Sequence, residues 1–110
     1  MRRIIKVKLK REQLEALFLL SNFYVGHYDP VGFGNLIAKE LLLEVSDRMQ
    51  AMIENWEQKK FTLRLTPAQS LAFYAFWAKI ELSRHPYEMV IIYNIFESIN
   101  KSNPYENAFS

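Results

Sequence analysis

Two stretches of the chain decide its fold: Ile5-Lys6-Val7-Lys8-Leu9-Lys10-Arg11-Glu12-Gln13 and, 56 positions later, Phe61-Thr62-Leu63-Arg64-Leu65-Thr66-Pro67-Ala68-Gln69. In each stretch apolar and polar residues alternate before a helical pattern begins, and a period of two is typical of a half-buried strand. The match continues without a gap to identical pairs at Ala16 and Ala72 and at Pro30 and Pro86. Because repeats at a fixed spacing usually mean stacked or pseudo-symmetric units, we predict a tandem β-α-α repeat.

Apolar residues spaced by three and four predict four helices. We expect them over about 11–24, from a start between Pro30 and Leu36 to about Gln58, over 67–80, and from Pro86 to about Lys101. Two up-and-down helices between the strands make the strands antiparallel. The predicted fold class is therefore α+β and mostly helical, with a two-stranded antiparallel sheet packed against four helices.

Two of the predicted helices carry start signals. Thr66 is expected to cap the third helix, with Pro67 at its first position and Gln69 completing a capping box. Asp29 is expected to cap the second helix and Pro30 to open it. Both Asp29 and Thr66 are therefore interpreted as structural residues rather than catalytic ones.

The length and composition predict one domain over residues 1–101, with pseudo-repeats 4–58 and 60–101 and a flexible C-terminal tail over 102–110. Half of the residues are hydrophobic, which excludes a disordered chain. The absence of cysteine excludes a disulfide scaffold or a thiolate site and fits a reducing compartment.

Charges near the N-terminus bear on location. Lys6, Lys8 and Lys10 interrupt the apolar run that a signal peptide would need, and no segment is apolar for long enough to span a bilayer. We therefore expect a cytoplasmic protein without membrane contact.

Basic residues gather in the first strand and recur in the second. Six of the first eleven residues are Lys or Arg and none is acidic, although the formal net charge is only +2. The alternation is expected to project Lys6, Lys8, Lys10 and Arg64 from one outer sheet face. Arg2, Arg3, Lys59 and Lys60 are expected near its ends. The candidate contact residues are Lys6, Lys8, Lys10, Lys60 and Arg64.

Such a face is a candidate for binding nucleic acid or an acidic partner protein. It lacks the outward aromatic residues that stacking on single strands requires. The alternative interpretation is that lysines on exposed strands prevent edge-to-edge aggregation.

The loop Gly26–Asn35 contains all three glycines of the chain and is a second candidate site. A helix start with nearby glycines can bring backbone N–H groups close to a small anion or ligand. The candidate residues are His27, Tyr28, Asp29, Gly32 and Gly34. The alternative interpretation is a cap and a tight turn, since Gly-x-Gly alone is a weak phosphate signal.

We predict no metal site, cofactor or catalytic residue. The pseudo-symmetric arrangement places His27 and His85, the two histidines, at opposite ends of the fold, which argues against a shared site. The carboxylates Glu40, Glu44 and Asp47 are expected to form a solvated helix face.

Aromatic residues are dense in the third predicted helix, which contains Phe73, Tyr74, Phe76 and Trp77. At helical spacing such residues are core first and interface second. The fourth helix has few polar positions, so we expect a homodimer that uses helix four or helix three, with Tyr93 or Trp77 near its centre.

Three functional hypotheses remain from the sequence. The leading one is a small, non-catalytic protein-interaction or structural domain that self-associates. The alternative is a nucleic-acid-associated protein that uses the basic strand face. The third is a small-ligand or enzymatic site at the Gly26–Asn35 loop.

Overall fold

A computed structural model describes residues 4–102 and contains one antiparallel pair of strands, β1 (Ile5–Lys10) and β2 (Lys60–Leu65). Ile5 pairs with Leu65 at one end of the ladder and Lys10 with Lys60 at the other. The inward residues are apolar and buried: Ile5, Val7, Leu9, Phe61, Leu63 and Leu65. The α+β class and the antiparallel pairing are confirmed. Arg2, Arg3 and residues 103–110 of the predicted tail lie outside the described residues.

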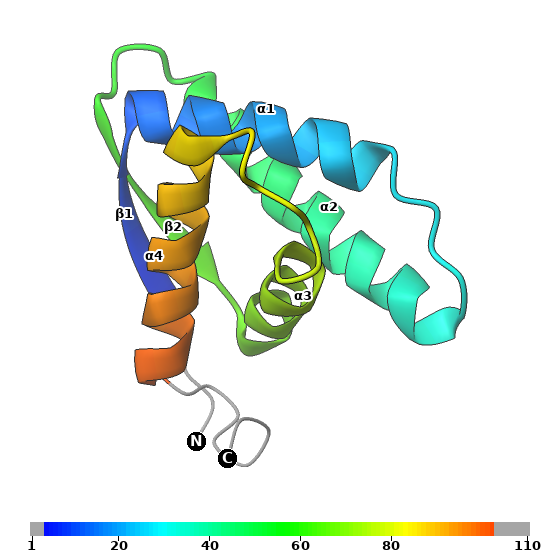
Figure 1. Cartoon of the computed structure of the whole chain (residues 1–110). Coiled ribbons are helices and arrows are strands. Elements are labelled where there is room, and N and C mark those ends of the chain that lie inside the picture. The colour runs from blue at the N-terminus through cyan, green and yellow to red at the C-terminus, as the bar shows by residue number, and fades with distance from the viewer. Residues whose placement is uncertain (1–3, 103–110) are drawn as a thin grey trace.

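Four helices follow the predicted order: α1 (Arg11–Gly26), α2 (Phe33–Ile53), α3 (Pro67–Trp77) and α4 (Pro86–Ser102). The sheet lies at one side of the molecule, α4 runs beside β1, and α2 extends away from the sheet toward the α1–α2 connection (Figure 1). Helix α3 contacts both α2 and α4. It also contacts β2, so α3 joins the sheet to two helices.

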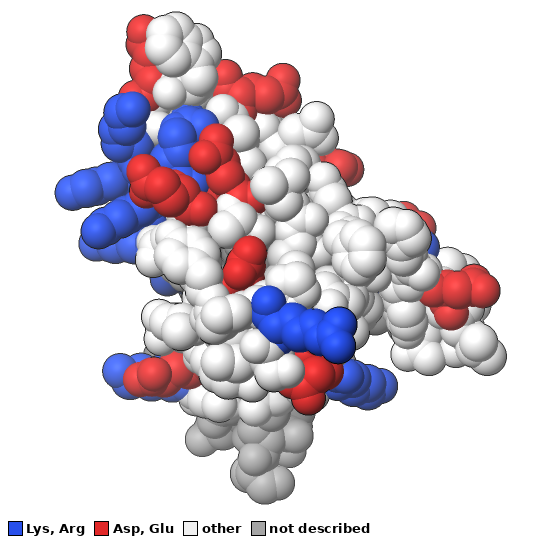
Figure 2. Space-filling model, turned by 45° about the horizontal axis from the view of Figure 1, so that its top comes forward, with Lys and Arg blue, Asp and Glu red and all other residues white. Residues whose placement is uncertain are grey.

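The outer face of the sheet carries the alternate residues of both strands. Lys and Arg side chains gather at the sheet side of the molecule (Figure 2). Acidic side chains border this cluster in the same view. The concentration of cations is therefore local, although the whole chain is nearly balanced in charge.

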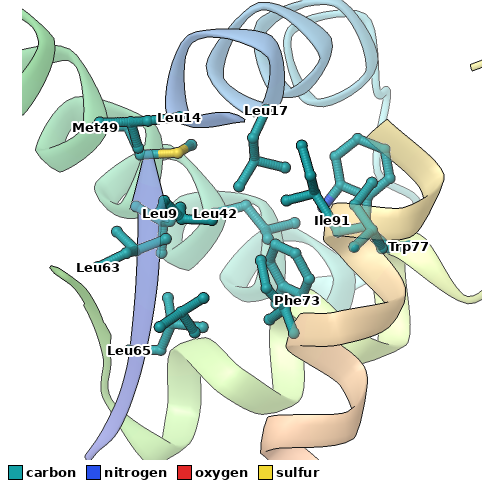
Figure 3. Close-up of a cluster of buried hydrophobic side chains, with 14 of the residues drawn as sticks. Leu9, Leu14, Leu17, Leu42, Met49, Leu63, Leu65, Phe73, Trp77 and Ile91 are labelled. Atoms are coloured by element: carbon teal, nitrogen blue, oxygen red, sulfur yellow. The ribbon is translucent and has the colours of Figure 1, made fainter. Parts of the chain in front are cut away.

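Buried side chains from the sheet and all four helices meet in one core. Leu9, Leu63 and Leu65 approach it from the strands, and Phe73 and Trp77 approach it from α3 (Figure 3). Tyr74 and Phe76 are half-buried against this cluster. The aromatic residues of α3 are thus core residues. The expectation that Trp77 lies exposed at a dimer interface is wrong, because Trp77 is only 1% exposed.

The start of α3 is capped as predicted. Thr66 Oγ1 accepts a hydrogen bond from the Gln69 backbone N–H at 3.1 Å, and Gln69 Oε1 accepts one from the Thr66 N–H at 3.0 Å. At the start of α1, Gln13 Oε1 likewise accepts from the Lys10 N–H at 2.9 Å. A lysine side chain has no acceptor to return that bond, so α1 has half of the capping box.

The start of α2 corrects the predicted cap. Gly32, not Asp29, is the N-cap. The helix begins at Phe33, which lies inside the predicted range from Pro30 to Leu36, although Pro30 itself does not open it. Gly32 has a φ of +93°, a conformation that glycine adopts without steric cost. The chain therefore needs the turn at Gly32 before the helix starts, and Asp29 lies exposed outside it.

The end of α2 is earlier than the apolar spacing predicted. The helix stops at Ile53 instead of Gln58, and Trp56, which falls inside the predicted helix, is 75% exposed. Helix α3 similarly ends at Trp77, three residues before the predicted Ile80. In both cases the apolar pattern continues past the last helical residue.

Candidate binding face on the sheet

Four cations predicted to share the outer sheet face do so: Lys6, Lys8, Lys10 and Arg64. Lys60, expected near the end of this face, pairs with Lys10 and lies on it too. We call these five residues the basic face. All five are exposed. Lys6 lies opposite Arg64, Lys8 opposite Thr62, and Lys10 opposite Lys60. Within residues 4–102 the two ion pairs join Arg11 to Glu15 and Lys101 to Glu97, so neither involves this face.

A hollow of about 730 Å³ opens on the basic face. Its lining combines outward cations with polar and apolar side chains from α1, α2 and the segment before β2: Lys8, Leu9, Lys10, Gln13, Met52, Gln58, Lys60, Phe61, Thr62 and Arg64. The volume is within the range of small-ligand sites. The hollow is open to solvent rather than enclosed.

A second hollow of about 430 Å³ lies at the other end of β2. It is lined by Ile4, Arg48, Met52, Thr62, Arg64 and Thr66. Met52, Thr62 and Arg64 belong to both linings, so the hollows are neighbours. Together they form a groove along β2, which we call the edge groove.

The hydrogen-bond pattern shows which edge of β2 faces this groove. The Arg11 N–H donates to the Lys59 carbonyl at 2.9 Å, so this pair continues the ladder as a hydrogen-bonded pair. Hydrogen-bonded and non-hydrogen-bonded pairs alternate in antiparallel sheets. Lys60, Thr62 and Arg64 therefore turn their backbone groups away from β1.

Two side chains already use this outer edge. The Arg64 carbonyl accepts a hydrogen bond from Arg48 Nη1, and the Lys60 carbonyl accepts one from Gln58 Nε2 at 2.7 Å. Thr62 lies between them and lines both hollows. Its backbone N–H and carbonyl are the central groups of the edge and have no hydrogen-bond partner within residues 4–102.

Arg11 holds the segment at one end of the edge groove. Its guanidinium donates to the carbonyls of Ile53 at 3.2 Å, Asn55 at 2.5 Å and Gln58 at 2.9 Å. The same group lies 5.2 Å from the centre of the Phe61 ring. The turn that carries the exposed Trp56 is thus fixed to the sheet.

The Gly26–Asn35 loop does not bring its candidate residues together. His27 Nδ1 donates to the Phe23 carbonyl at 2.6 Å, and its ring lies against Phe23. The Tyr28 ring packs on Phe76 with a centroid separation of 5.2 Å. None of the loop residues lines either hollow on the sheet. The side chains of Val31 and Phe33, next to the start of α2, are apolar and exposed.

Both histidines approach the last turns of α1, which corrects the prediction that they lie at opposite ends. His27 contacts Phe23, while His85 Nε2 lies 3.4 Å from the Tyr24 hydroxyl. His85 is half-buried. In the part of the chain that the structure describes, no three His, Asp or Glu residues are grouped to hold a metal ion.

The carboxylates of α2 lie on an exposed face, as expected. Glu44 and Arg48, four residues apart on α2, are joined through buried Gln69. Gln69 Oε1 accepts from Arg48 Nη1 at 3.2 Å, and Gln69 Nε2 donates to Glu44 Oε1 at 3.2 Å. This bridge joins α2 to the start of α3.

Comparison with family models, with curated proteins and with solved structures gives no match to this chain. None of the helices within residues 4–102 has the length and apolar character needed to cross a bilayer. The geometry of the sheet face is therefore the basis from which function is inferred.

Sequence reasoning found the cations of the basic face but missed the rest of the edge groove. The missed residues are Ile4, Arg48, Met52, Gln58 and Thr62. The sequence held one local signal for this region: Asn55 is a turn-forming residue, which indicates that α2 ends before Gln58. The remaining residues are brought together by tertiary packing.

Proposed function

We propose that this chain is a small, non-catalytic interaction domain that binds a negatively charged partner through the basic face. The observation that carries the proposal is the set of five exposed cations on two paired strands, none of which has an acidic partner among the described residues. Cations so arranged attract an anionic partner and fix its position. The open hollow between them provides space for that partner.

The placement of like charges favours binding over the alternative of aggregation control. Lys6 faces Arg64 and Lys10 faces Lys60, and like charges directly opposite each other destabilise a sheet. Lysines on a single strand suffice to blunt an edge. A partner that neutralises both strands accounts for the second set of cations.

The test replaces Lys6, Lys8 and Lys10 with Glu and measures retention on immobilised polyglutamate. A matched control replaces Lys79, Arg84 and Lys101 with Glu, which makes the same change in net charge away from the sheet. Retention is expected to be lost in the first variant and largely kept in the second. Equal retention of the two variants would falsify the proposal.

Self-association through α4 is a second candidate function. Tyr87, Val90 and Tyr93 are exposed at spacings of three along the face of α4 opposite to its buried isoleucines. Such an apolar stripe is suited to a twofold contact between identical helices. Light scattering at increasing concentration tests it: a dimer that becomes a monomer on Tyr93→Lys supports this contact, and a constant mass near 13 kDa excludes it.

We also infer that the two halves are a tandem repeat related by a pseudo-twofold axis. Val7 pairs with Leu63, which is its own equivalent at the 56-residue offset. Gln13 and Gln69, also equivalent, make the same bond to the N-cap backbone. Superposition of 5–24 on 61–80 tests the inference. A cytoplasmic location stays a prediction from the sequence.

A further inference from the structure

We propose that the edge groove binds an extended, acidic segment of a partner protein, which adds to the sheet as a third strand along β2. This inference rests on the proposed function, because the basic face supplies the charge that selects the segment. It adds the shape of the ligand and the backbone groups that recognise it.

The stretch of β2 edge at Thr62 is the first reason, since the carbonyls of Lys60 and Arg64 on either side of it already accept hydrogen bonds from Gln58 and Arg48. Thr62 turns its N–H and carbonyl away from β1, and both hollows open beside it. An unpaired strand edge is a template for another extended chain, whose main chain supplies hydrogen bonds while its alternate side chains enter pockets. A strand of six residues such as β2 spans about 20 Å, so the groove suits a segment of similar length.

The mixed lining is the second argument. Lys60 and Arg64 project beside the groove, while Met52 and Ile4 provide apolar contact in it. Successive residues of a strand point to opposite sides. A peptide that alternates acidic and apolar residues therefore presents its acidic side chains to the cations and its apolar side chains to Met52 and Ile4. The lining is thus complementary to a peptide of that pattern.

The segment before β2 favours a peptide over a nucleic acid as the ligand of the edge groove. Trp56 is the exposed aromatic nearest in sequence to the groove, two residues from Gln58 in its lining. Glu54 and Glu57 flank it and are exposed. A base stacked on Trp56 would bring its phosphates close to two carboxylates, whereas an apolar peptide residue packs on the ring without that repulsion.

The direct test uses fluorescence polarisation with a labelled peptide of alternating Glu and Val, slightly longer than β2. We compare it with the same peptide N-methylated at every residue, which keeps its charges but removes its backbone donors. The methylated peptide is expected to bind about tenfold more weakly, the effect of losing one or two net hydrogen bonds. A peptide of alternating Lys and Val is expected not to bind.

Thr62→Pro is the matched change in the protein. Proline removes the N–H at the free edge and leaves the β1–β2 ladder bonds in place, a position where strands tolerate it. Thr62→Val keeps the N–H and serves as the control. Binding of the Glu-Val peptide is expected to fall about tenfold in Thr62→Pro and to stay unchanged in Thr62→Val.

Several outcomes overturn the inference. Equal binding of the methylated peptide, or none of the Glu-Val peptide, excludes strand addition, as does tighter binding of an oligothymidylate. If Thr62→Pro does not fold, the methylated peptide still decides the question on the unmodified protein. The two proposals can fail separately. If the Lys-to-Glu variant loses retention on polyglutamate but the Glu-Val peptide and its methylated form bind equally, the basic face remains a binding site and only strand addition along β2 is excluded.

Discussion

Lys6 lies directly opposite Arg64 on the outer face of the sheet, so that two like charges face each other across the strands. At the other end of the ladder Lys10 faces Lys60 in the same way. Cross-strand pairs of like charge reduce sheet stability. The face that we assign to binding is therefore also the least favourable electrostatic arrangement in the sheet.

Replacing Arg64 with Thr should stabilise the protein. Removal of the repulsion with Lys6 is expected to raise the free energy of unfolding by about 0.2–1 kcal/mol, and the gain should shrink as salt screens the pair. Urea denaturation at low and high ionic strength measures both effects, with Lys79→Thr as the control. A less stable Arg64→Thr protein would show that the guanidinium makes a net favourable contribution.

Replacing Thr66 with Ala should destabilise α3. Loss of the bond from the Gln69 N–H to Thr66 Oγ1 is expected to cost about 1 kcal/mol, within the usual range of about 0.5–2. Asp29→Ala, at a residue that does not cap α2, is expected to leave the denaturation midpoint unchanged. Equal effects of the two substitutions would contradict the cap assignment.

Gln69→Leu tests the bridge between α2 and α3. Gln69 is 2% exposed and bonds to Arg48, Glu44 and the Thr66 N–H, so leucine leaves several polar groups without their partner. The expected loss is about 1–3 kcal/mol. Gln13→Leu, at the equivalent position with a single such bond, should lose less. Urea midpoints at an unchanged m-value compare the two.

Ser70→Ala should leave stability unchanged or raise it by up to about 1 kcal/mol. Among the described residues the Ser70 hydroxyl is fully buried without a hydrogen-bond partner, so its removal ends a desolvation cost. Thermal melting compares the variant with the parent chain. A clear drop in melting temperature would mean that the hydroxyl has a partner.

The strands and the basic face could be predicted from sequence because their signal is local. Alternation fixes which side of β1 each residue faces, and the same alternation at 61–65 fixes β2. The antiparallel pairing followed from counting helices. The cap of α3 was predictable for the same reason, since the three residues that form it, Thr66, Pro67 and Gln69, lie within four consecutive positions.

The C-terminal end of α2 was predicted too late, because contacts with a residue far along the chain reinforce the local turn signal at Asn55. The apolar spacing continues through Trp56, yet the Arg11 guanidinium donates hydrogen bonds to the carbonyls of Ile53, Asn55 and Gln58. These bonds join residues more than 40 positions apart. At the N-terminal end of α2 the turn lies at Gly32, which is the N-cap, so Asp29 does not cap the helix.

The edge groove was hidden from sequence reasoning for a related reason. Met52 comes from α2, Gln58 from the turn and Thr62 from β2, and each looks ordinary in its own segment. The two histidines were misplaced because the helix exits were assumed to follow ideal symmetry. The contact of His85 with Tyr24 shows that the connection after α3 returns to α1.

The pairing of Lys10 with Lys60 also has a kinetic consequence, because the ladder joins residues 50 positions apart. Closing so long a loop carries an entropy cost that packing of α1 on α2 reduces. We expect the helical hairpin to form before the strands meet. Val7→Ala should then accelerate unfolding more than it slows folding. A strand bound along β2 would engage only the finished sheet and would lengthen the lifetime of the native state.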